Sequence, residues 1–450
     1  MRRHMRSGLL ATGGAIAVTL LAGSVAEGEG RPRAHGFDPL AGRLAEVFRL
    51  DVSEVRVTYD YWPSQARVEG EAELRFEMRP GQRRPLFHFN PLRRATAAQE
   101  RALLDALELD GEKLDPADAG DVQLIRSSPS AEVAFEIQRD VRPEASHTLR
   151  ARWSVPVEAA PGRFFANFDD TEGPDSETET QWPTISSPEE YIRHRIRIRV
   201  HADQPYTVLG SGSVHQRAAT DAQTWDIDTG RPIPSSIVFF SAVPSAKFHT
   251  EQFEVRDVAV TIASNRSAEI NQRARRITRR TISRLVDDFG PFPMSRMQIM
   301  LTGWDGGMEY FGATRTGVGA LEHELVHMYF GTATLNRTWR DTWFDEAAVE
   351  WWLAQDEITP LPPGFRSNLA RGRSEVAPGF DEAAYDDGAK ILGGIARSLG
   401  GSRPMIAFLA DLHRRRAFRP FTTDELIDDV VAAQTRIDRG TLERWLYTKP

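Results

Sequence analysis

The sequence predicts a multidomain α+β protein in which a β-sandwich-like amino-terminal domain is followed by a mostly helical domain. Short runs that alternate between apolar and polar residues, the pattern of half-buried strands, recur from residue 51 to residue 262. Beyond that point apolar residues return every three or four positions, which is the spacing of amphipathic helices. The chain has 450 residues, of which 40% are hydrophobic, so it can bury the cores of two or three domains.

Residues 1–26 have the pattern of a secretory signal peptide, and residues 27–37 form a short linker rich in Glu, Gly and Arg. Three arginines precede an uncharged, mostly apolar stretch over residues 8–25, and Ser-Val-Ala at residues 24–26 is a small-x-small cleavage signal. We therefore expect a secreted or periplasmic protein that is exported through a Sec-type signal peptide. The alternative is an uncleaved signal that anchors the protein in a membrane, because about 18 apolar residues can just span a bilayer.

A β-rich amino-terminal domain is expected over residues 38–257. The alternating runs that predict its strands are residues 55–59, 72–76, 133–137, 192–200, 253–255 and 258–262, the last of these falling at the boundary. Gly, Pro and Asp separate the runs, as is typical of a sandwich or a twisted sheet. The stretch 167–190 is acidic and rich in Thr, Ser and Pro, which predicts a long surface loop.

A mostly helical domain is expected over residues 258–450. Ser267 is placed to cap a helix that runs to about Phe289, where Gly290 and Pro291 end it. A strand is predicted over residues 297–302. Further helical patterns cover residues 391–399, 404–413 and 424–433.

Composition excludes several classes of function. The chain has no cysteine, so disulfides, thiolate catalysis and Cys-ligated metals are excluded, and any metal site must use His, Asp or Glu. The formal net charge is -8 and no block of basic residues is present, so we expect no nucleic-acid partner. No stable membrane partner is expected either, unless the signal is uncleaved.

The segment His-Glu-Leu-Val-His at residues 323–327 predicts a metal site. On a helix, His323 and His327 lie one turn apart on the same face, so both imidazoles can bind one ion. Glu324 then lies beside the ion, where it can act on a water molecule. Apolar residues on the opposite face of the segment would anchor this helix in the core.

Two histidines do not complete a catalytic zinc site, which usually has three protein ligands and one open position. Without cysteine, the third ligand has to be a later His, Asp or Glu. Glu346 is the candidate, because it opens a second predicted helix and 18 residues separate it from His327. This length is sufficient for a turn and a return of the chain that brings the second helix against the first.

These residues resemble the gluzincin metallopeptidases of the aminopeptidase N family, relatives of leukotriene hydrolase. The family pattern H-E-x-x-H, 18 residues, then E is matched without gaps by His323, Glu324, His327 and Glu346. The flanking Met-Tyr-Phe-Gly and Trp-Phe-Asp-Glu-Ala are similar to x-Trp-Phe-Gly and Trp-Leu-Asn-Glu-Gly of the family. The resemblance implies a thermolysin-like zinc peptidase domain over residues 258–450 and one Zn²⁺ per chain.

Two further motifs carry the resemblance away from the metal. Residues 306–310 are similar to the G-x-M-E-N strand, whose backbone pairs with the peptide and whose Glu binds its free α-amine in the family. Tyr385-Asp-Asp-Gly-Ala is similar to Tyr-Glu-Lys-Gly-Ala, whose Tyr donates a hydrogen bond to the tetrahedral oxyanion. The resemblance thus implies Tyr385 as a catalytic residue. The substrate-binding residues that it implies are Gly306, Gly307, Met308 and Glu309.

The chain departs from the family pattern in three places. Tyr310 replaces the Asn of the strand motif, Asp387 replaces the Lys of the tyrosine motif, and the chain ends at Pro450 where many relatives continue into a large helical domain. That domain helps to exclude internal peptides in relatives, so strict exopeptidase action is less strongly implied. The amino-domain Gln that relatives use as a second amine ligand is expected near residues 177–183.

The mechanism that these residues imply is metal-assisted hydrolysis of a peptide bond. Glu324 would take a proton from water and pass it to the leaving amine, Tyr385 would stabilise the oxyanion, and Glu309 would hold the amino terminus. Asp345 or Glu350 is expected to hydrogen-bond a ligand imidazole, and the sequence leaves the choice open.

Three hypotheses about function follow. The first is a zinc aminopeptidase that acts on peptides. The second is a zinc endopeptidase or a non-peptide hydrolase on the same scaffold. The third is a catalytically inactive relative that binds a metal or a peptide. The sequence does not indicate the side-chain preference, the natural substrate, the physiological metal or the oligomeric state.

Overall fold

The structure is a computed structural model, and the fold is described for the residues whose placement it defines. These residues are 50–65, 67–81, 83–89, 104–126, 133–156, 166–167, 182–183, 190–303, 306–371, 382–433 and 436–448. The predicted signal peptide, the predicted linker and most of the predicted loop at 167–190 lie outside them. None of the described helices is long and apolar enough to cross a membrane.

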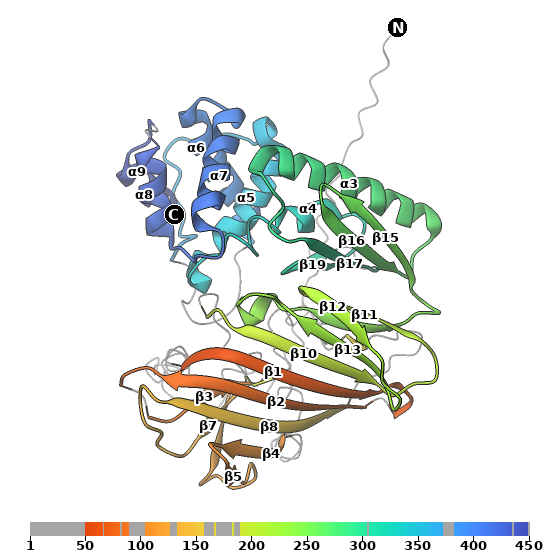
Figure 1. Ribbon diagram of the computed structural model, residues 1–450. Coiled ribbons are helices and arrows are strands. Elements are labelled where there is room, and N and C mark those ends of the chain that lie inside the picture. Colours follow the sequence, from red (N-terminus) through yellow and green to blue (C-terminus); the bar gives the residue numbers. More distant parts are fainter. Residues whose placement is uncertain are drawn as a thin grey trace, which may run out of the picture. The chain divides into compact units, whose positions relative to one another are not determined.

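The amino-terminal part is built on an eight-stranded sheet (Figure 1). In sheet order its strands are β12 (Ser213–Arg217), β13 (Gln223–Asp228), β10 (Arg193–Val200), β1 (Leu50–Trp62), β2 (Arg67–Met78), β8 (Ser146–Pro156), β4 (Leu104–Leu109) and β5 (Glu112–Leu114). All neighbours pair antiparallel except β1 and β10, which run parallel with Val57 opposite Ile196.

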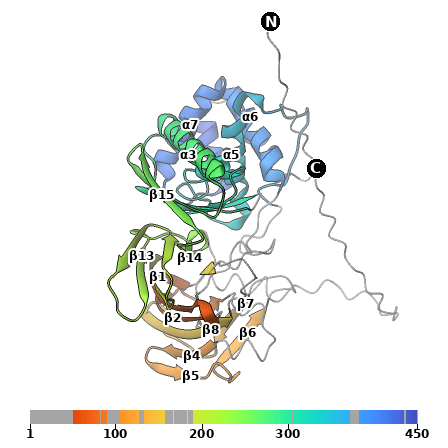
Figure 2. The same cartoon turned by 90° about the vertical axis from the view of Figure 1, so that its right-hand side faces the viewer.

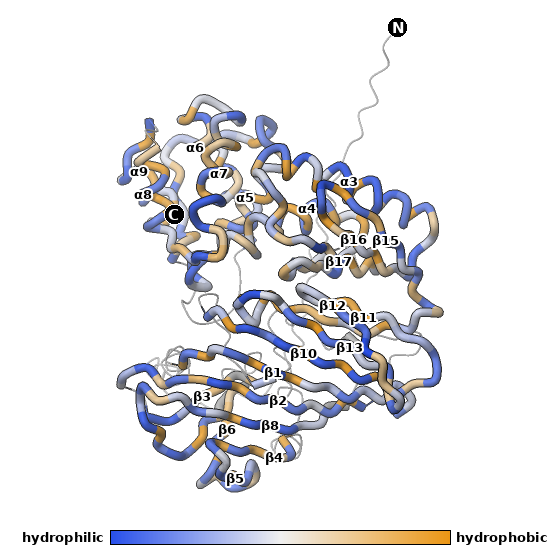
Figure 3. The backbone as a smooth tube through the Cα atoms, viewed as in Figure 1, coloured by the Kyte–Doolittle hydropathy of each residue, from blue (hydrophilic) through white to orange (hydrophobic). Residues whose placement is uncertain are grey.

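Alternation of side chains gives this sheet one buried and one charged face. Along β1 and β2 nearly every second residue is buried, including Tyr59 and Leu74, as the period-two pattern predicts. Figure 3 shows the same alternation of polar and apolar residues along the long strands. The outward residues pair across strands, for example Arg197 with Asp226 at 2.8 Å, so the polar face is a ladder of ion pairs.

Two small sheets complete this part. One contains β11 (Tyr206–Gly210), β14 (Phe240–Pro244) and β9 (Ala166–Asn167), and the other contains β3 (Leu86–His88), β7 (Val133–Ile137) and β6 (Val122–Arg126). Phe87 and Phe135 of the second small sheet join one hydrophobic core with Tyr59 and Trp153 of the large sheet. The predicted β-rich amino-terminal domain is therefore confirmed.

The second part begins with a five-stranded sheet. In order its strands are β15 (His249–Val255), β16 (Val258–Ser264), β17 (Arg296–Leu301), β19 (Ala313–Thr316) and β18 (Gly307–Tyr310). Its centre is parallel and its two outer strands are antiparallel to their neighbours. The expected domain boundary at Asp257 falls in the turn of the β15–β16 hairpin. The alternating pattern grouped the run 253–255 with the amino-terminal strands, but this run lies in β15 and pairs with β16 in the second sheet.

Helices form most of the rest of the chain. They are α3 (Ala268–Phe289), α4 (Leu321–Val326), α5 (Trp343–Ala354), α6 (Ala389–Leu399), α7 (Ser402–Arg416), α8 (Thr423–Ala432) and α9 (Arg439–Tyr447). Short 3₁₀ turns occur at Pro63–Gln65, Ser235–Ile237, Trp339–Asp341 and Gln355–Glu357, and Ala384–Gly388 is a π-helical turn. The predicted helical part is therefore confirmed, with a five-stranded sheet that the sequence showed only in part.

The first of these helices follows the sequence signals closely. The Ser267 hydroxyl accepts a hydrogen bond from the Ile270 amide, and Gly290 ends the helix with φ of 92°, a conformation that favours glycine. Ile282 and Leu285 on its buried face share a core with Ile299 of β17. Figure 2 shows α3, α5, α6 and α7 grouped together, and this packing holds the helices that carry the site.

Candidate active site

Two helices supply the three predicted metal ligands. His323 lies in α4 and His327 directly caps its carboxyl end, while Glu346 lies in the first turn of α5. Buried apolar residues fix both helices in one core, including Leu325 of α4 and Trp351 of α5. The backbone therefore presents the three side chains to one point.

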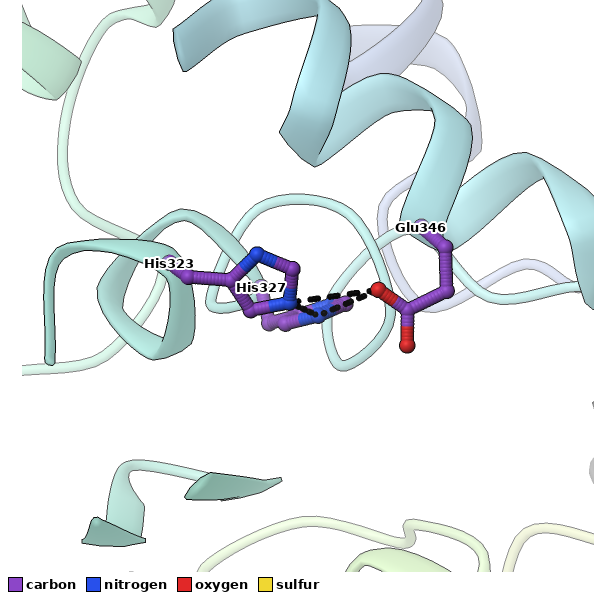
Figure 4. Close-up of side chains that lie close together, drawn as sticks. All are labelled: His323, His327 and Glu346. Atoms are coloured by element: carbon purple, nitrogen blue, oxygen red, sulfur yellow. Dashed lines mark hydrogen bonds and ion pairs between the residues drawn. The ribbon is translucent and has the colours of Figure 1, made fainter. Parts of the chain in front are cut away.

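The three donor atoms form a compact triangle (Figure 4). The Nε2 atoms of His323 and His327 are 2.9 Å apart, and Glu346 Oε2 lies 3.2 Å from the first and 3.3 Å from the second. Ligand atoms around a tetrahedral zinc ion with bonds of about 2.0–2.1 Å are separated by about 3.3 Å. The triangle thus fits three corners of a tetrahedral zinc site, with the fourth corner left for water or substrate.

Hydrogen bonds on the far side of each ring turn the Nε2 atoms toward this point. His323 Nδ1 lies 3.0 Å from Glu350 Oε1, and His327 Nδ1 lies 3.0 Å from the carbonyl oxygen of Phe330. Both acceptors require a proton on Nδ1, so the neutral rings carry their lone pairs on Nε2. Glu350 is the carboxylate that orients an imidazole, whereas Asp345 accepts a hydrogen bond from the Glu346 amide.

The charge balance of the site favours a cation. Burial alone would lower the pKa of His323, but hydrogen bonds with Glu346 and Glu350 and the negative charge of Glu346 raise it to about 9. For Glu346, burial raises the pKa and the two imidazoles outweigh this effect, so the pKa lies well below its usual range. Glu346 Oε2 is buried and faces the Nε2 atoms of His323 and His327 at 3.2 and 3.3 Å. A buried anionic oxygen facing two ring nitrogens is typical of a metal ligand.

Glu324 lies beside this triangle and is almost completely buried, with 3% of its surface exposed. Its Oε2 atom has no hydrogen-bond partner in the described part of the chain, and its carboxylate lies against Gly307 of β18. Burial and then the negative charge of Glu309 raise the pKa of Glu324 to about 8. A carboxyl with a raised pKa that lies within 4.8 Å of a ring nitrogen of His327 can accept and return a proton near neutral pH.

Tyr385 reaches the site from the π-helical turn Ala384–Gly388. Its hydroxyl donates a 2.8 Å hydrogen bond to Glu346 Oε1, and its ring stacks on His323 with centroids 5.9 Å apart. Burial and the charge of Glu346 raise the pKa of Tyr385 well above its usual value, so the hydroxyl stays protonated. The structure therefore places a hydrogen-bond donor next to the metal position.

Three of the residues predicted to bind substrate, Gly307, Met308 and Glu309, lie in β18 (Gly307–Tyr310), and the fourth, Gly306, directly precedes this strand. Within the described residues β18 is the outermost strand of its sheet, next to β19. An exposed strand edge can pair with an extended peptide. A carboxylate oxygen of Glu309 lies within 4.8 Å of a carboxylate oxygen of Glu324 and of a ring nitrogen of His327. Met308 packs against a separate hydrophobic cluster.

The two residues that depart from the family motifs both contact other side chains. Tyr310 is buried and stacks on Phe239 with ring centroids 4.9 Å apart. Asp387 Oδ1 lies 3.7 Å from Nζ of Lys390, which is in the next helical turn. Within residues 177–183, where a second amine ligand was expected, only Trp182 and Pro183 are described, and the expected Gln lies outside the described residues.

Sequence reasoning missed three features of the site. The carbonyl of Phe330 leaves no sequence signal, because any residue supplies a backbone oxygen. Strand β19 is short and carries buried threonines, whose hydroxyls bond carbonyls of β18 and the adjoining loop. The contact between Gly307 and Glu324 depends on how β18 packs against α4. The pair of adjacent glycines at residues 306 and 307 was the sequence feature that could have indicated a close approach there.

Comparison with known proteins gives matches of structure but none of sequence. No protein-family model and no curated protein matches the chain. A structure of an M1 zinc metallopeptidase from Deinococcus radiodurans is 20% identical, covers 89% of this chain and 95% of that chain, and has a TM-score of 0.64. Yeast LTA4 hydrolase is 14% identical over 90% of this chain and 68% of that chain, with a TM-score of 0.65.

A third structure is similar over half of its own length. Legionella pneumophila aminopeptidase A in complex with aspartic acid is 13% identical, covers 89% of this chain and 49% of that chain, and has a TM-score of 0.66. At these identities the likeness concerns the fold, and it spans both the sheet-rich part and the helical part. The fold predicted from the motifs is therefore confirmed, and the chain has the fold of the M1 zinc metallopeptidases.

Proposed function

We propose that this protein is a zinc-dependent metallopeptidase that removes amino-terminal residues from peptides. The observation that carries the proposal is the meeting of His323, His327 and Glu346 at one point, with Glu324 beside it. The donor set contains two imidazoles and one carboxylate, which is the set of a catalytic zinc site. The fold shared with M1 zinc metallopeptidases supports one such ion per chain.

The residues of the chain divide the chemistry between them. A zinc ion at the triangle would supply a Lewis acid that polarises the scissile carbonyl and lowers the pKa of water toward about 7. Glu324 then removes a proton from the attacking water and returns it to the leaving amine. Tyr385 donates a hydrogen bond from its hydroxyl to the oxygen on which negative charge develops.

The arrangement around β18 supports cleavage from the amino end. Among the described residues no strand pairs with the outer edge of β18, so a peptide backbone can pair there. The Glu309 carboxylate lies within 4.8 Å of Glu324, where it can bind an α-ammonium group. Binding of the amino terminus there would place the first peptide bond over the triangle. Mutants of a two-domain M1 zinc metallopeptidase have been solved bound to L-arginine and L-tryptophan, and one from Deinococcus radiodurans with a Tyr-Ser-Ala substrate.

The experiment compares free and blocked substrates. We expect the purified protein to release the chromophore from aminoacyl anilides and to leave amino-acetylated peptides intact. Cleavage of amino-acetylated peptides at the same rate as free peptides would favour an endopeptidase. Hydrolysis of non-peptide substrates alone would favour a non-peptide hydrolase on the same scaffold. Absence of turnover on a defined peptide library with zinc bound would favour an inactive binding protein.

A matched pair of variants tests the role of Glu324. Glu324→Gln is expected to keep zinc and to lower kcat by several orders of magnitude, because an amide cannot accept the proton. Glu322→Gln is the control, since Glu322 lies on the same helix but its carboxylate contacts Arg280 and Thr281. If both variants retain activity, Glu324 is not the general base.

A further inference from the structure

Strand β18 directs its side chains to two opposite faces of the five-stranded sheet. The Glu309 carboxylate lies within 4.8 Å of Glu324 and His327, whereas Met308 and Tyr310 pack in a hydrophobic cluster of their own. Successive residues of a strand point to opposite faces, so this division follows from the backbone. Packing of Met308 and Tyr310 therefore supports the strand from the face opposite to Glu309.

This support matters because β18 has few other contacts to hold it. The strand has four residues, and among the described residues β19 is the one strand that pairs with it. A strand with one neighbour makes about half the backbone hydrogen bonds of an inner strand, so the packing of its side chains carries a larger share of its local stability.

Phe239, which directly precedes β14, supplies this packing at the end of β18 next to Glu309. Its ring stacks on Tyr310 with ring centroids 4.9 Å apart and an interplanar angle of 24°, and both side chains are buried. The backbone of Phe239 is fixed by Ser211, whose hydroxyl accepts from the Phe239 amide at 2.9 Å and whose amide donates to the Phe239 carbonyl at 2.7 Å. A fixed ring is thus placed against the residue that follows Glu309.

A hydrogen bond extends this attachment by one residue. The Phe311 amide donates to the carbonyl oxygen of Ile237 at 2.9 Å, and Ile237 ends the 3₁₀ turn Ser235–Ile237. Tyr310 stands where the family motif has Asn, and an Asn side chain has no ring to stack on Phe239. The stacked pair is therefore a feature of this chain that the shared motif does not predict.

We propose that Phe239 is a positioning residue for recognition of the substrate amine: its ring holds Tyr310 and so fixes the backbone from which Glu309 reaches the α-ammonium group. The proposal rests on the function proposed above and deepens it, because it assigns part of the affinity for the amino terminus to a side chain that is 1% exposed. Loss of the ring loosens Glu309 and leaves the three metal ligands in place.

The test uses two hydroxamates that differ only in the α-amino group, L-leucine hydroxamic acid and 4-methylpentanehydroxamic acid. Both can bind zinc through the hydroxamate, so the ratio of their dissociation constants measures recognition of the amine alone. Calorimetry on the zinc-loaded protein gives both constants without turnover. In the wild type we expect the compound with the amino group to bind more tightly.

In Phe239→Leu the preference for the amino compound should fall about 3–10-fold, which is what a stacked aromatic pair contributes beyond the area that it buries. The dissociation constant of 4-methylpentanehydroxamic acid should be unchanged. Phe240→Leu is the matched control and should keep both constants, because Phe240 is also buried but packs on Tyr59 and Trp182 in the other core. An unchanged preference in Phe239→Leu, or equal weakening of both compounds, would overturn the proposal.

A double-mutant cycle with Tyr310→Leu tests the route through the stacked pair. Tyr310→Leu alone should lower the preference by the same factor, and this variant serves as the test if Phe239→Leu does not fold. In the Tyr310→Leu background Phe239 has lost its partner ring, so Phe239→Leu should lower the preference by less than about twofold. Equal factors in the two backgrounds, or a full preference in Tyr310→Leu, would overturn the proposal.

Glu309→Gln separates failure of this proposal from failure of the proposed function. Equal binding of the two hydroxamates by the wild type would contradict amine recognition, and both proposals would fall. A preference that is lost in Glu309→Gln but kept in Phe239→Leu would overturn the role of Phe239 alone.

Discussion

At the scale of single residues, the two imidazoles proposed as zinc ligands depend on the groups that bind their Nδ1 atoms. Glu350 Oε1 accepts from His323 Nδ1, and the Phe330 carbonyl accepts from His327 Nδ1. Such partners set the tautomer and the direction of the ring, and their loss typically weakens metal binding about 10–100-fold. Only the partner of His323 is a side chain, so it can be tested by substitution.

We expect Glu350→Ala to raise the zinc dissociation constant about 10–100-fold, because His323 loses the acceptor that fixes its Nδ1 proton. Competition against a chromophoric chelator measures this constant. Glu322→Ala removes a carboxylate of the preceding helix that is bound to Arg280 and serves as the control. Equal dissociation constants for wild type and Glu350→Ala would show that Glu350 does not orient the ligand.

The same residues show which contacts a sequence can predict. The meeting of His323 and His327 follows from helix periodicity alone, and the placing of Glu346 required only a chain return of suitable length. The choice between Asp345 and Glu350 depends on how α5 is rotated against α4. Tertiary packing sets that rotation, so spacing in the sequence could not decide it.

At the scale of elements, the π-helical turn before α6 brings Tyr385 to the site. Residues of this turn pack against α5, and Gly388 permits the close approach, since a Cβ there would lie 2.8 Å from the Cβ of Ala347. Ala347 directly follows the ligand Glu346. The separation of the two elements therefore sets the position of the Tyr385 hydroxyl relative to Glu346 Oε1.

We expect Gly388→Ala to push the turn away from α5, to destabilise the fold by about 1–3 kcal/mol and to lower kcat. Tyr385→Phe alone should lower kcat about 10²–10³-fold, because it removes the hydroxyl proposed to donate a hydrogen bond to the oxyanion. If Gly388 acts through the tyrosine, Gly388→Ala should cause little further loss of kcat in the Tyr385→Phe background.

Steady-state kinetics and urea unfolding of the four proteins provide the measurements. Gly440→Ala is the control for stability, because its Cβ would make only ordinary contacts, with Arg444 of α9 and with Asp438, which caps the helix. If Gly388→Ala lowers kcat by the same factor in the wild type and in Tyr385→Phe, Gly388 does not act by positioning Tyr385.

Elements were predictable where local signals suffice. The cap at Ser267 and the glycine at 290 set the bounds of α3, and period-two alternation indicated β1, β2 and β10. Sheet membership was not predictable, because the run 253–255 alternates like the strands before it. It pairs with β16 because Arg256 and Asp257 form a two-residue turn with positive φ, and Arg-Asp is not one of the Asn-Gly or Asp-Gly pairs that signal such a hairpin in a sequence.

At the scale of the whole molecule, a buried histidine links stability to pH. His194 of β10 is fully buried, its Nε2 lies 2.9 Å from Ser235 Oγ, and burial lowers its pKa to about 3. The unfolded chain takes up a proton on this residue near pH 6.5, whereas the folded protein does not. Stability from neutral His194 is therefore fully present above pH 6.5 and is lost as the pH falls toward 3.

We expect neutral His194 to lower the free energy of unfolding by about 2 kcal/mol when the pH falls from 7 to 5, at roughly 1.4 kcal/mol for each pH unit below 6.5. His194→Gln should thus show a smaller loss of stability over this range. Urea unfolding of both proteins at the two pH values, with chelator present throughout, measures the difference. Parallel losses in the two proteins would show that His194 does not carry the effect.

We propose that His323, His327 and Glu346 hold one catalytic zinc ion. The measurement that tests it most directly is the zinc content per chain of the wild type and of Glu346→Gln after dialysis against a weak chelator, with peptidase activity measured on the same samples. We predict one zinc per active wild-type chain, and loss of both zinc and activity in Glu346→Gln. Equal zinc content in the two proteins, or peptidase activity in a zinc-free wild type, would contradict the account.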